Sequence, residues 1–396
     1  MTPIGRRLPF AVASLHRHAP EPVGAALHEA RDDLAVLARL GETVLGLPVH
    51  GVDGAGLPLR QRLEATATDA FLVVHAGSLA VQWYRDGSVP TRPQALMSIT
   101  KSIVGCLAGS LIGARQLDPD RLAADYVPEL LDGGYAPASV RDLLDMRTGG
   151  PGYREDYDDP DGELAHLARA VDGTPGAATL RDLIRFNPRV AEHDGPFCYR
   201  SLDTDALGWV LERASGVAIA DLIAFFLARL GVTGPVDMAI DSAGVPQCSG
   251  GLAMTPLDVA RFGLMVLHGG AVGSRQVVPT SFFKDTRSGG PDSPEAFRSR
   301  VDQLLDEQID TDVEGLRTGH YRNQFWVPRT GGRALMCLGI HGQWILVDPD
   351  TDAVVVKLSS WPDPQDPAKF SDAVEAGRVA TAHLADNQPQ AAPWLI

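Results

Sequence analysis

The sequence predicts an α+β fold, in which helices flank a central antiparallel sheet and a mainly helical lobe is inserted into the chain. Strand patterns occur towards both ends, at residues 71–84 and 335–358, and the pattern between them is mainly helical. Neither group of strands is large enough to form a stable sheet alone, so we expect both to join in one sheet. Residues 1–121 and 246–396 then form the sheet lobe and residues 122–245 the helical lobe, with the functional site in the cleft between them.

The elements of the first third of the chain lead to a serine. Helical periodicity predicts a helix over residues 25–44, and Phe71–Tyr84 is typical of a β-hairpin with Gly77-Ser78 at or near its turn. The hairpin is followed by Ser98. Residues 103–112 are apolar on all sides and contain small residues, which predicts a buried helix with Ser98 at its N-terminus.

The remaining elements are predicted from the same helical and strand patterns of apolar residues. Residues 140–146 and 204–214 predict helices of the middle lobe, separated by loops rich in glycine and aspartate. The C-terminal part returns to strands, with a turn at Asp348–Asp352, and ends in a helix. These last elements are expected at residues 335–339, 344–349, 353–358 and 371–385.

Composition favours a small-molecule partner. The chain has 396 residues, 44% of them hydrophobic, and 50 acidic against 35 basic residues give a net charge of −15. This length can bury a large core. An acidic chain without basic runs disfavours binding to nucleic acid or to an anionic membrane surface, and no apolar run is long enough to span a bilayer. We expect small substrates and cytoplasmic residence, and we keep a homodimer as one option for the oligomeric state.

Cysteine and histidine usage predicts neither a metal site nor a cofactor. The cysteines are far apart and form no Cys-x-x-Cys motif or Cys/His cluster, which disfavours a disulfide framework and a structural zinc site. They are Cys106, Cys198, Cys248 and Cys337. Arg6-Arg7 resembles the start of a twin-arginine export signal, but the apolar run after it is short.

Ser98 is the candidate nucleophile because Lys101, one of only four lysines, follows it by three residues. Residues three apart on a helix are neighbours, so an uncharged Lys101 could take the proton of the Ser98 hydroxyl. The helix N-terminus would favour a developing oxyanion and disfavour a charged lysine. The alternative is that Ser98 only caps the helix and that Lys101 is a solvated surface residue.

A second serine and lysine have the same spacing, at Ser281 and Lys284, and Tyr321-Arg322-Asn323 follows about forty residues later. No long buried helix follows this pair. We interpret it as a short amphipathic helix capped by Thr280 or Ser281, with residues 321–327 entering a strand.

Two further segments could complete a site around Ser98. Tyr199 could be the second proton carrier, with neighbouring cations lowering the pKa of its phenol, although a lone tyrosine is more often a buried structural residue. Gly339-Ile340-His341-Gly342 interrupts a strand with glycines that let the backbone approach a ligand. This segment suits the second amide of an oxyanion hole whose first amide is that of Ser98, and an ordinary edge strand is the alternative.

These residues resemble the class C β-lactamase and penicillin-binding-protein superfamily of serine hydrolases, whose pattern is Ser-x-x-Lys, then Tyr-x-Asn, then a Lys-Thr-Gly strand. Within it, the chain most closely resembles the 6-aminohexanoate-dimer hydrolases, which act on nylon oligomers. The likeness covers most of the chain after about residue 60. The segments that carry it are Leu96–Ser102, Tyr126–Leu130, Glu155–Tyr157, Gly339–Gln343 and Val356–Pro364.

The resemblance implies a β-lactamase/transpeptidase-like fold, no metal or cofactor, and an acyl-enzyme on Ser98 with Lys101 and Tyr199 as acid/base partners. It assigns the oxyanion hole to the amides of Ser98 and Ile340. Ser201 stands where the family pattern has asparagine, and Cys337 and Leu338 replace the lysine and threonine, so β-lactamase activity is not expected. The residues expected to contact substrate are Tyr157, Ser201, Ser249, Gly339 and His341.

The sequence therefore predicts a serine hydrolase for linear amides of the 6-aminohexanoate-dimer type, for short carboxylic esters, or for both. The acidic loop around Tyr157 could attract an ammonium group, or could be an ordinary solvated loop. One alternative is a carboxylesterase or acyltransferase with the same fold. Another is a non-catalytic penicillin-binding-like sensor, which retention of both Lys101 and Tyr199 disfavours.

Overall fold

A computed structural model describes residues 12–14, 34–149, 155–298, 316 and 318–387 of the chain. The twin arginine at Arg6-Arg7 and the first part of the helix expected over residues 25–44 lie outside the described residues. The described part of that helix is α1, Leu34–Leu45.

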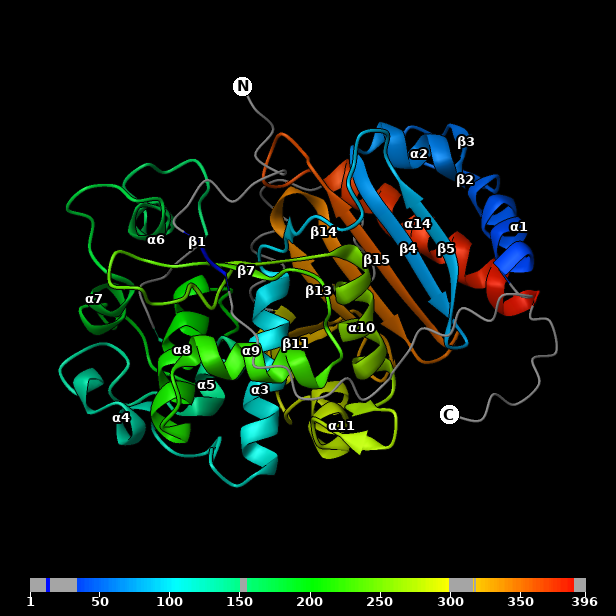
Figure 1. Ribbon diagram of the computed structural model, residues 1–396. Helices are drawn as coiled ribbons and strands as arrows, with labels where there is room; N and C mark the ends of the chain where they lie inside the picture. Colours follow the sequence, from blue (N-terminus) through cyan, green and yellow to red (C-terminus); the bar gives the residue numbers. More distant parts are fainter. Residues whose placement is uncertain (1–11, 15–33, 150–154, 299–315, 317, 388–396) are drawn as a thin grey trace.

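A seven-stranded antiparallel sheet forms the centre of the molecule, in the order β11-β12-β13-β14-β15-β4-β5 (Figure 1). β15 pairs with β4 along its whole length, with Val354 opposite Val74. The expected joining of the two groups of strands in one sheet is therefore confirmed. The strands are β4 Thr68–His75, β5 Ser78–Tyr84, β11 His320–Arg322, β12 Phe325–Val327, β13 Leu335–Gly339, β14 Gln343–Asp348 and β15 Ala353–Ser359.

Helices cover both faces of this sheet (Figure 1), because its central strands are apolar on both sides. In β15, Val354 and Val356 point into one core and Val355 into the other, as the two-residue period of a strand requires. One face packs against α1, α2 (Leu59–Ala65) and α14 (Pro367–Asp386). The other face packs against α3 (Ile99–Gly113) and α10 (Pro256–Leu267).

A smaller four-stranded sheet, in the order β1-β7-β8-β6, brings distant segments to the start of α3. β6 (Gln94–Ala95) lies just before Ser98 and pairs with β8 (Leu252–Met254), which follows Ser249. β8 also pairs with β7 (Asp237–Ala239), and β7 pairs with β1 (Val12–Ser14). Two short hairpins complete the strands: β2 Pro48–His50 with β3 Gly56–Pro58, and β9 Ala271–Val272 with β10 Arg275–Gln276.

The middle of the chain is mainly helical, as expected. α5 begins with a capping box, in which the Ser139 hydroxyl accepts from the Asp142 amide while the Asp142 carboxylate accepts from the Ser139 amide. α8 is bounded by extended backbone at Arg200 and by a left-handed Gly216. The helices of this part are α4 Ala123–Tyr126, α5 Val140–Asp145, α6 Glu163–Val171, α7 Leu180–Arg185, α8 Ser201–Ser215 and α9 Ile219–Arg229, with a 3₁₀ turn at Pro128–Leu130. A further helix, α11 (Thr280–Ser288), follows later in the chain.

Three local expectations are wrong in detail. Residues 321–327 form a hairpin rather than one strand, because Asn323 and Gln324 both adopt positive φ, 54° and 67°, and turn the chain between β11 and β12. The helix α11 follows Pro279 and has no side-chain cap from Thr280 or Ser281. The glycine-containing segment after residue 339 connects β13 to β14 as a 3₁₀ turn, Ile340–Gly342, rather than interrupting one strand.

Candidate active site

Ser98 lies at the N-terminus of α3 and follows a residue with a strained backbone conformation. Met97 before it has φ of 49°, a left-handed conformation that side chains other than glycine rarely adopt. The Ser98 side chain makes no capping hydrogen bond to the helix. The alternative in which Ser98 serves only as a helix cap is therefore wrong, and its hydroxyl is directed elsewhere.

The partner of the Ser98 hydroxyl is Lys101. The Lys101 side chain is buried, and its Nζ lies 2.7 Å from Ser98 Oγ, 3.0 Å from Ser201 Oγ and 2.8 Å from the Ser249 carbonyl oxygen. Burial lowers the pKa of Lys101, and the negative charges of Glu155 and Asp205 partly oppose this shift. A lysine with a lowered pKa at hydrogen-bond distance from a serine can act as its general base.

Tyr199 is a second partner of Ser98. Its hydroxyl is hydrogen-bonded to that of Ser98, and Lys101 Nζ lies 5.0 Å from the centre of its ring. We expected cations to lower the pKa of Tyr199, but its pKa is raised well above the usual value. Burial is the main cause, and the charge of Glu155 adds to it. Tyr199 is thus a neutral phenol, which is able to donate a proton.

Aromatic side chains surround Tyr199, and of these only Tyr321 stood out in the sequence, as part of the second serine–lysine set. The ring of Trp326 lies 5.3 Å from the Tyr199 ring between centroids, and the Tyr321 ring lies 6.0 Å away, almost perpendicular at 89°. Phe197 and Phe297 complete the cluster. These residues come from three separate segments of the chain, so no local pattern could have grouped them.

The turn after β13 approaches the Ser98 segment closely. A Cβ atom on Gly339 would lie 2.6 Å from the Leu96 carbonyl oxygen and 3.1 Å from Met97 Cβ, so only glycine fits there. The next residue, Ile340, is therefore held near the N-terminus of α3. His341 after it has φ of 62°, so both amides of the expected oxyanion hole adjoin a left-handed residue.

His341 anchors this turn. It is 6% exposed, its Nδ1 lies 2.9 Å from the Trp361 carbonyl oxygen, and its amide donates to Pro364 at 2.9 Å. The Trp361 ring packs on Gly342, where a Cβ atom would lie only 2.3 Å from a ring carbon. In this structure His341 fixes the backbone around Ile340 through the segment that follows β15.

Tyr157 and Ser201 are connected through Glu155, a residue that the sequence analysis did not place in the site. The Tyr157 hydroxyl donates to Glu155 Oε2 at 2.9 Å. Glu155 Oε1 accepts from the Ser201 amide at 2.8 Å and also from the Ser201 hydroxyl. Ser201 in turn contacts Lys101, so Glu155 of the acidic loop is linked to Lys101 through the Ser201 hydroxyl.

Ser249 contributes backbone rather than its hydroxyl to Lys101, through the carbonyl oxygen described above. The second serine–lysine pair lies apart from this arrangement. Ser281 and Lys284 are both solvent-exposed on α11, and Tyr321 and Asn323 belong to a buried network beside it. Neither exposed side chain lies in a site that shields a reacting group from water, which disfavours this pair as the nucleophile and base.

Within the described residues, no group of three or more His, Cys, Asp or Glu side chains is arranged to hold a metal ion, and no helix has the length and apolar character needed to cross a bilayer. None of the four cysteines, all of which the structure describes, forms a disulfide, and Cys106, Cys248 and Cys337 are buried.

Comparison with known proteins agrees with this geometry. The β-lactamase family model matches residues 59–378. The 6-aminohexanoate-dimer hydrolase of Paenarthrobacter ureafaciens is 34% identical over 368 residues, which cover 87% of this chain and 90% of that protein.

Two solved structures show the same fold. A Bacillus anthracis protein described as a candidate 6-aminohexanoate-dimer hydrolase has a TM-score of 0.74 at 24% identity, over 87% of each chain. EstCE1, a hydrolase with promiscuous acyltransferase activity, has a TM-score of 0.59 at 15% identity, over 82% of this chain and 98% of its own. The family match over most of the chain, with the serine, lysine and tyrosine brought together, leads to one conclusion: this chain belongs to the β-lactamase family of serine hydrolases, and it is similar to 6-aminohexanoate-dimer hydrolases.

Proposed function

We propose that the protein hydrolyses linear amides of the 6-aminohexanoate-dimer type through an acyl-enzyme on Ser98, and that it also turns over short carboxylic esters. The observation that carries the proposal is the buried Lys101 amine, 2.7 Å from Ser98 Oγ. The similarity to the Paenarthrobacter ureafaciens enzyme supports the amide substrate.

In acylation, the neutral Lys101 amine takes the proton of Ser98, and Oγ forms a bond to the substrate carbonyl carbon. The carbonyl oxygen becomes an oxyanion between the backbone amides of Ser98 and Ile340. When the carbon–nitrogen bond breaks, Tyr199 donates its phenol proton to the leaving amine, and the proton held by Lys101 replaces it. The amine leaves and Ser98 carries the acyl group.

In deacylation the same groups work in reverse order on a water molecule. Water gives its proton to Lys101 by way of Tyr199 and attacks the ester carbonyl, and Ser98 leaves as the hydroxyl when it recovers a proton. The neutral phenol of Tyr199 fits this role, because its raised pKa keeps it a donor at neutral pH.

The proposed substrate is supported by the residues around the catalytic groups. Ser201 contacts Lys101, Tyr157 is linked to Ser201 through Glu155, and Gly339 packs against the segment before Ser98. The acidic residues around Tyr157 would attract the ammonium end of a linear amide. Cys337 is buried, and Leu338 faces the core opposite to α3. Neither side chain supplies the cation or hydroxyl that would hold a β-lactam carboxylate.

The test is amine release from the linear 6-aminohexanoate dimer by purified protein, with Ser98→Ala as the matched variant. We expect release by the wild-type protein and a loss of about 10³-fold or more in the variant, because the nucleophile is removed. Mass spectrometry after mixing with a p-nitrophenyl ester should show one acyl group on Ser98. Unchanged turnover in Ser98→Ala would refute the mechanism.

A carboxylesterase or acyltransferase is the second candidate, because it would use the same acyl-enzyme with a different donor or acceptor. Turnover of p-nitrophenyl butyrate without amine release from the dimer would favour it, and acyl transfer to an added alcohol would separate transferase from esterase. Acylation of Ser98 without turnover of either substrate would instead indicate a non-catalytic sensor.

Cytoplasmic residence and a homodimer complete the proposal. Fractionation of cells that express the full chain tests the first, and light scattering on the purified protein tests the second.

A further inference from the structure

Helix α8 directs two polar residues, one turn apart, towards Lys101. Ser201 contacts the Lys101 amine directly, at 3.0 Å. Asp205, four residues later, accepts a hydrogen bond from the Ser249 amide at 3.0 Å. The carbonyl oxygen of the same Ser249 accepts from Lys101 at 2.8 Å. The backbone of one residue therefore connects the Asp205 carboxylate to the catalytic amine.

We propose that Asp205 is a positioning residue that controls the charge of Lys101 through the backbone of Ser249. It holds the Ser249 carbonyl in place as an acceptor, and its own negative charge favours the protonated amine. When Asp205 is neutral, the uncharged form of the Lys101 amine is favoured, and this form can accept the Ser98 proton. The inference rests on the proposed role of Lys101 as the general base.

Both Asp205 and Lys101 are buried. Burial raises the pKa of Asp205 to about 7, although hydrogen bonds from Ser249 and the charge of Lys101 oppose the shift. The pKa of Lys101 is lowered by burial and raised by Glu155 and Asp205. When two ionisable groups interact, the charge of one changes the pKa of the other. The observed pKa values then describe the pair rather than either residue alone.

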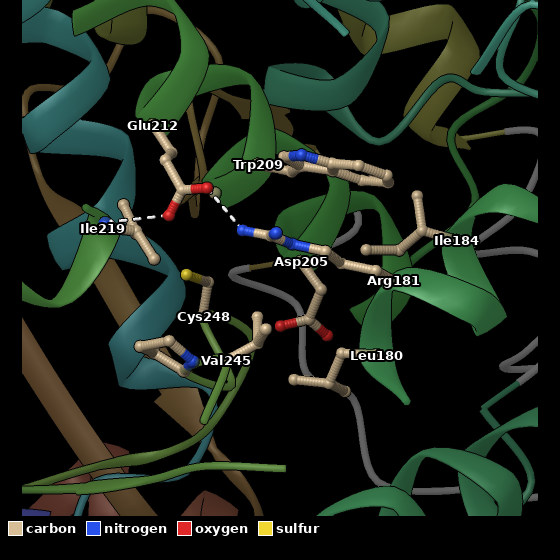
Figure 2. Close-up of a pocket in the computed structure, with 11 residues that line it drawn as sticks. Leu180, Arg181, Ile184, Asp205, Trp209, Glu212, Ile219, Val245 and Cys248 are labelled. Atoms are coloured by element: carbon tan, nitrogen blue, oxygen red, sulfur yellow. Dashed lines mark hydrogen bonds and ion pairs between the residues drawn. The ribbon is translucent and has the colours of Figure 1, made fainter. Parts of the chain in front are cut away.

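The other charged groups near Asp205 already have partners. Figure 2 shows the pocket beside it, lined among others by Leu180, Val245 and Cys248. The Arg181 guanidinium at this pocket is paired with Glu212, which also accepts from the Ile219 amide. The Cys248 thiol stays neutral because burial raises its pKa. Glu155 is the second carboxylate that affects Lys101, and it is linked to the amine through Ser201.

The small number of lysines makes a direct test possible. The chain has four, so ¹³C-labelled lysine gives four side-chain signals, and Lys101→Arg assigns the catalytic one. We expect the pKa of Lys101 to fall by at least about half a unit in Asp205→Asn, because the asparagine can still accept from Ser249 but carries no charge. A titration of Lys101 that is unchanged from wild type would overturn the proposal.

Asp203→Asn is the matched control. Asp203 is also a buried carboxylate of α8, and it is bonded to Tyr135, Thr148 and Arg200 rather than to the Lys101 network. The Lys101 titration should not move in this variant. If Asp205→Asn does not fold, Asp205→Ser removes the same charge from a smaller side chain and gives the same test.

A second readout separates this inference from the proposed function. A fluorophosphonate labels an activated serine whatever its natural substrate, and the labelling rate should fall on the acidic side as Lys101 becomes protonated. In Asp205→Asn this fall should move to lower pH, which a loss of stability alone would not do. Failure of the wild-type protein to label Ser98 would refute the proposed function, while the lysine titration would still decide the coupling.

Discussion

Among the residues that the structure describes, Lys101 has three hydrogen-bond partners, and all of them are uncharged groups: two serine hydroxyls and a backbone carbonyl. Each of the two carboxylates that affect its pKa reaches it through one intervening residue, Glu155 through Ser201 and Asp205 through Ser249. A direct carboxylate partner would hold the amine protonated. This arrangement places two carboxylates near Lys101, but neither forms a direct ion pair that would hold its amine protonated.

Tyr199→Phe tests the proton donor. We expect kcat/KM on the linear amide to fall by about 10²–10⁴-fold, because an amine cannot leave without a proton. Turnover of a p-nitrophenyl ester should fall much less, since p-nitrophenolate leaves as an anion. Steady-state kinetics on both substrates measures the difference.

Tyr321→Phe is the control for that variant, because the Tyr321 hydroxyl donates to Gln324 at 3.3 Å and not to the site. It should change both rates by less than about tenfold. Equal losses on amide and ester in Tyr199→Phe would show that the tyrosine shapes the pocket rather than donating the proton.

At the scale of elements, the end of β13 and the start of α3 are held together by a contact that only glycine allows. Gly339→Ala should lower kcat on the amide by about 10²–10³-fold, because the added Cβ atom meets the Leu96 carbonyl and moves the Ile340 amide from the oxyanion. KM and ester binding should change little. Single-turnover acylation of Ser98 measures the step.

Gly46→Ala serves as the matched substitution. A Cβ atom there would lie 3.4 Å from the Thr43 carbonyl oxygen, an ordinary contact, and we expect wild-type kcat. Wild-type acylation in Gly339→Ala would mean that the turn after β13 does not supply the oxyanion amide.

Strand β15 contains a buried amine that the proposed mechanism does not use. Lys357 Nζ lies 2.7 Å from Ser359 Oγ and 5.1 Å from the centre of the Trp361 ring, and burial lowers its pKa to about 7. A lysine in the unfolded chain has a pKa of about 10.4. Between these two pKa values the unfolded chain binds more protons than the folded protein, so the free energy of unfolding rises with pH across this window. Below pH 7 the buried amine is protonated, and its burial destabilises the folded protein to the full extent.

Lys357→Met should therefore raise the unfolding temperature at pH 7 and reduce its rise between pH 7 and pH 9. Calorimetry of both proteins at several pH values measures the effect. Lys284→Met, which removes an exposed lysine on α11, should leave the pH dependence as it is. Parallel curves for wild type and Lys357→Met would contradict the assignment.

At the scale of the whole molecule, one arginine joins segments from both halves of the chain. Arg322 on β11 donates to Asp145 at the end of α5, at 2.6 Å, and to Asp285 on α11, at 2.8 Å. Asp145 is buried, and burial raises its pKa. Arg322→Ala would leave this carboxylate with the Asn323 amide, 3.0 Å away, and with the more distant cation of Arg141, 3.7 Å away.

We expect Arg322→Ala to lower the free energy of unfolding by about 3 kcal/mol, because the buried Asp145 carboxylate loses its nearest cation. Urea unfolding measures the loss, and the double variant with Asp145→Asn should recover part of it. Arg333→Ala breaks an exposed pair with Asp350 and should cost less than about 1 kcal/mol. Equal losses in the two single variants would show that the buried pair is not special.

The sequence predicted the elements whose signal is local. The β4–β5 hairpin, α3, α14 and the three C-terminal strands each follow from one period of apolar residues, and they occur close to the expected positions. Turn geometry set by backbone conformation was missed at Asn323-Gln324, because neither residue is a glycine although both have positive φ. A left-handed residue other than glycine leaves no clear mark in composition.

The candidate site divides in the same way. Ser98 and Lys101 stand out because their spacing is helical, whereas Glu155, Asp205 and Trp326 join them only through the folded chain. Their distances in sequence from Lys101 range from about fifty to more than two hundred residues. The roles of the catalytic and substrate-binding residues stay predictions until the variants above are measured.

The pairing of β4 with β15 has a consequence for biosynthesis. Val74 and its partner Val354 are separated by about 280 residues, which a ribosome needs roughly 15 to 55 s to translate. During that time the β4–β5 hairpin is complete but lacks its neighbour, and β4 offers an open apolar edge to other chains. Slow translation would prolong this exposure, and holdase chaperones that cover the nascent hairpin would raise the yield of native enzyme.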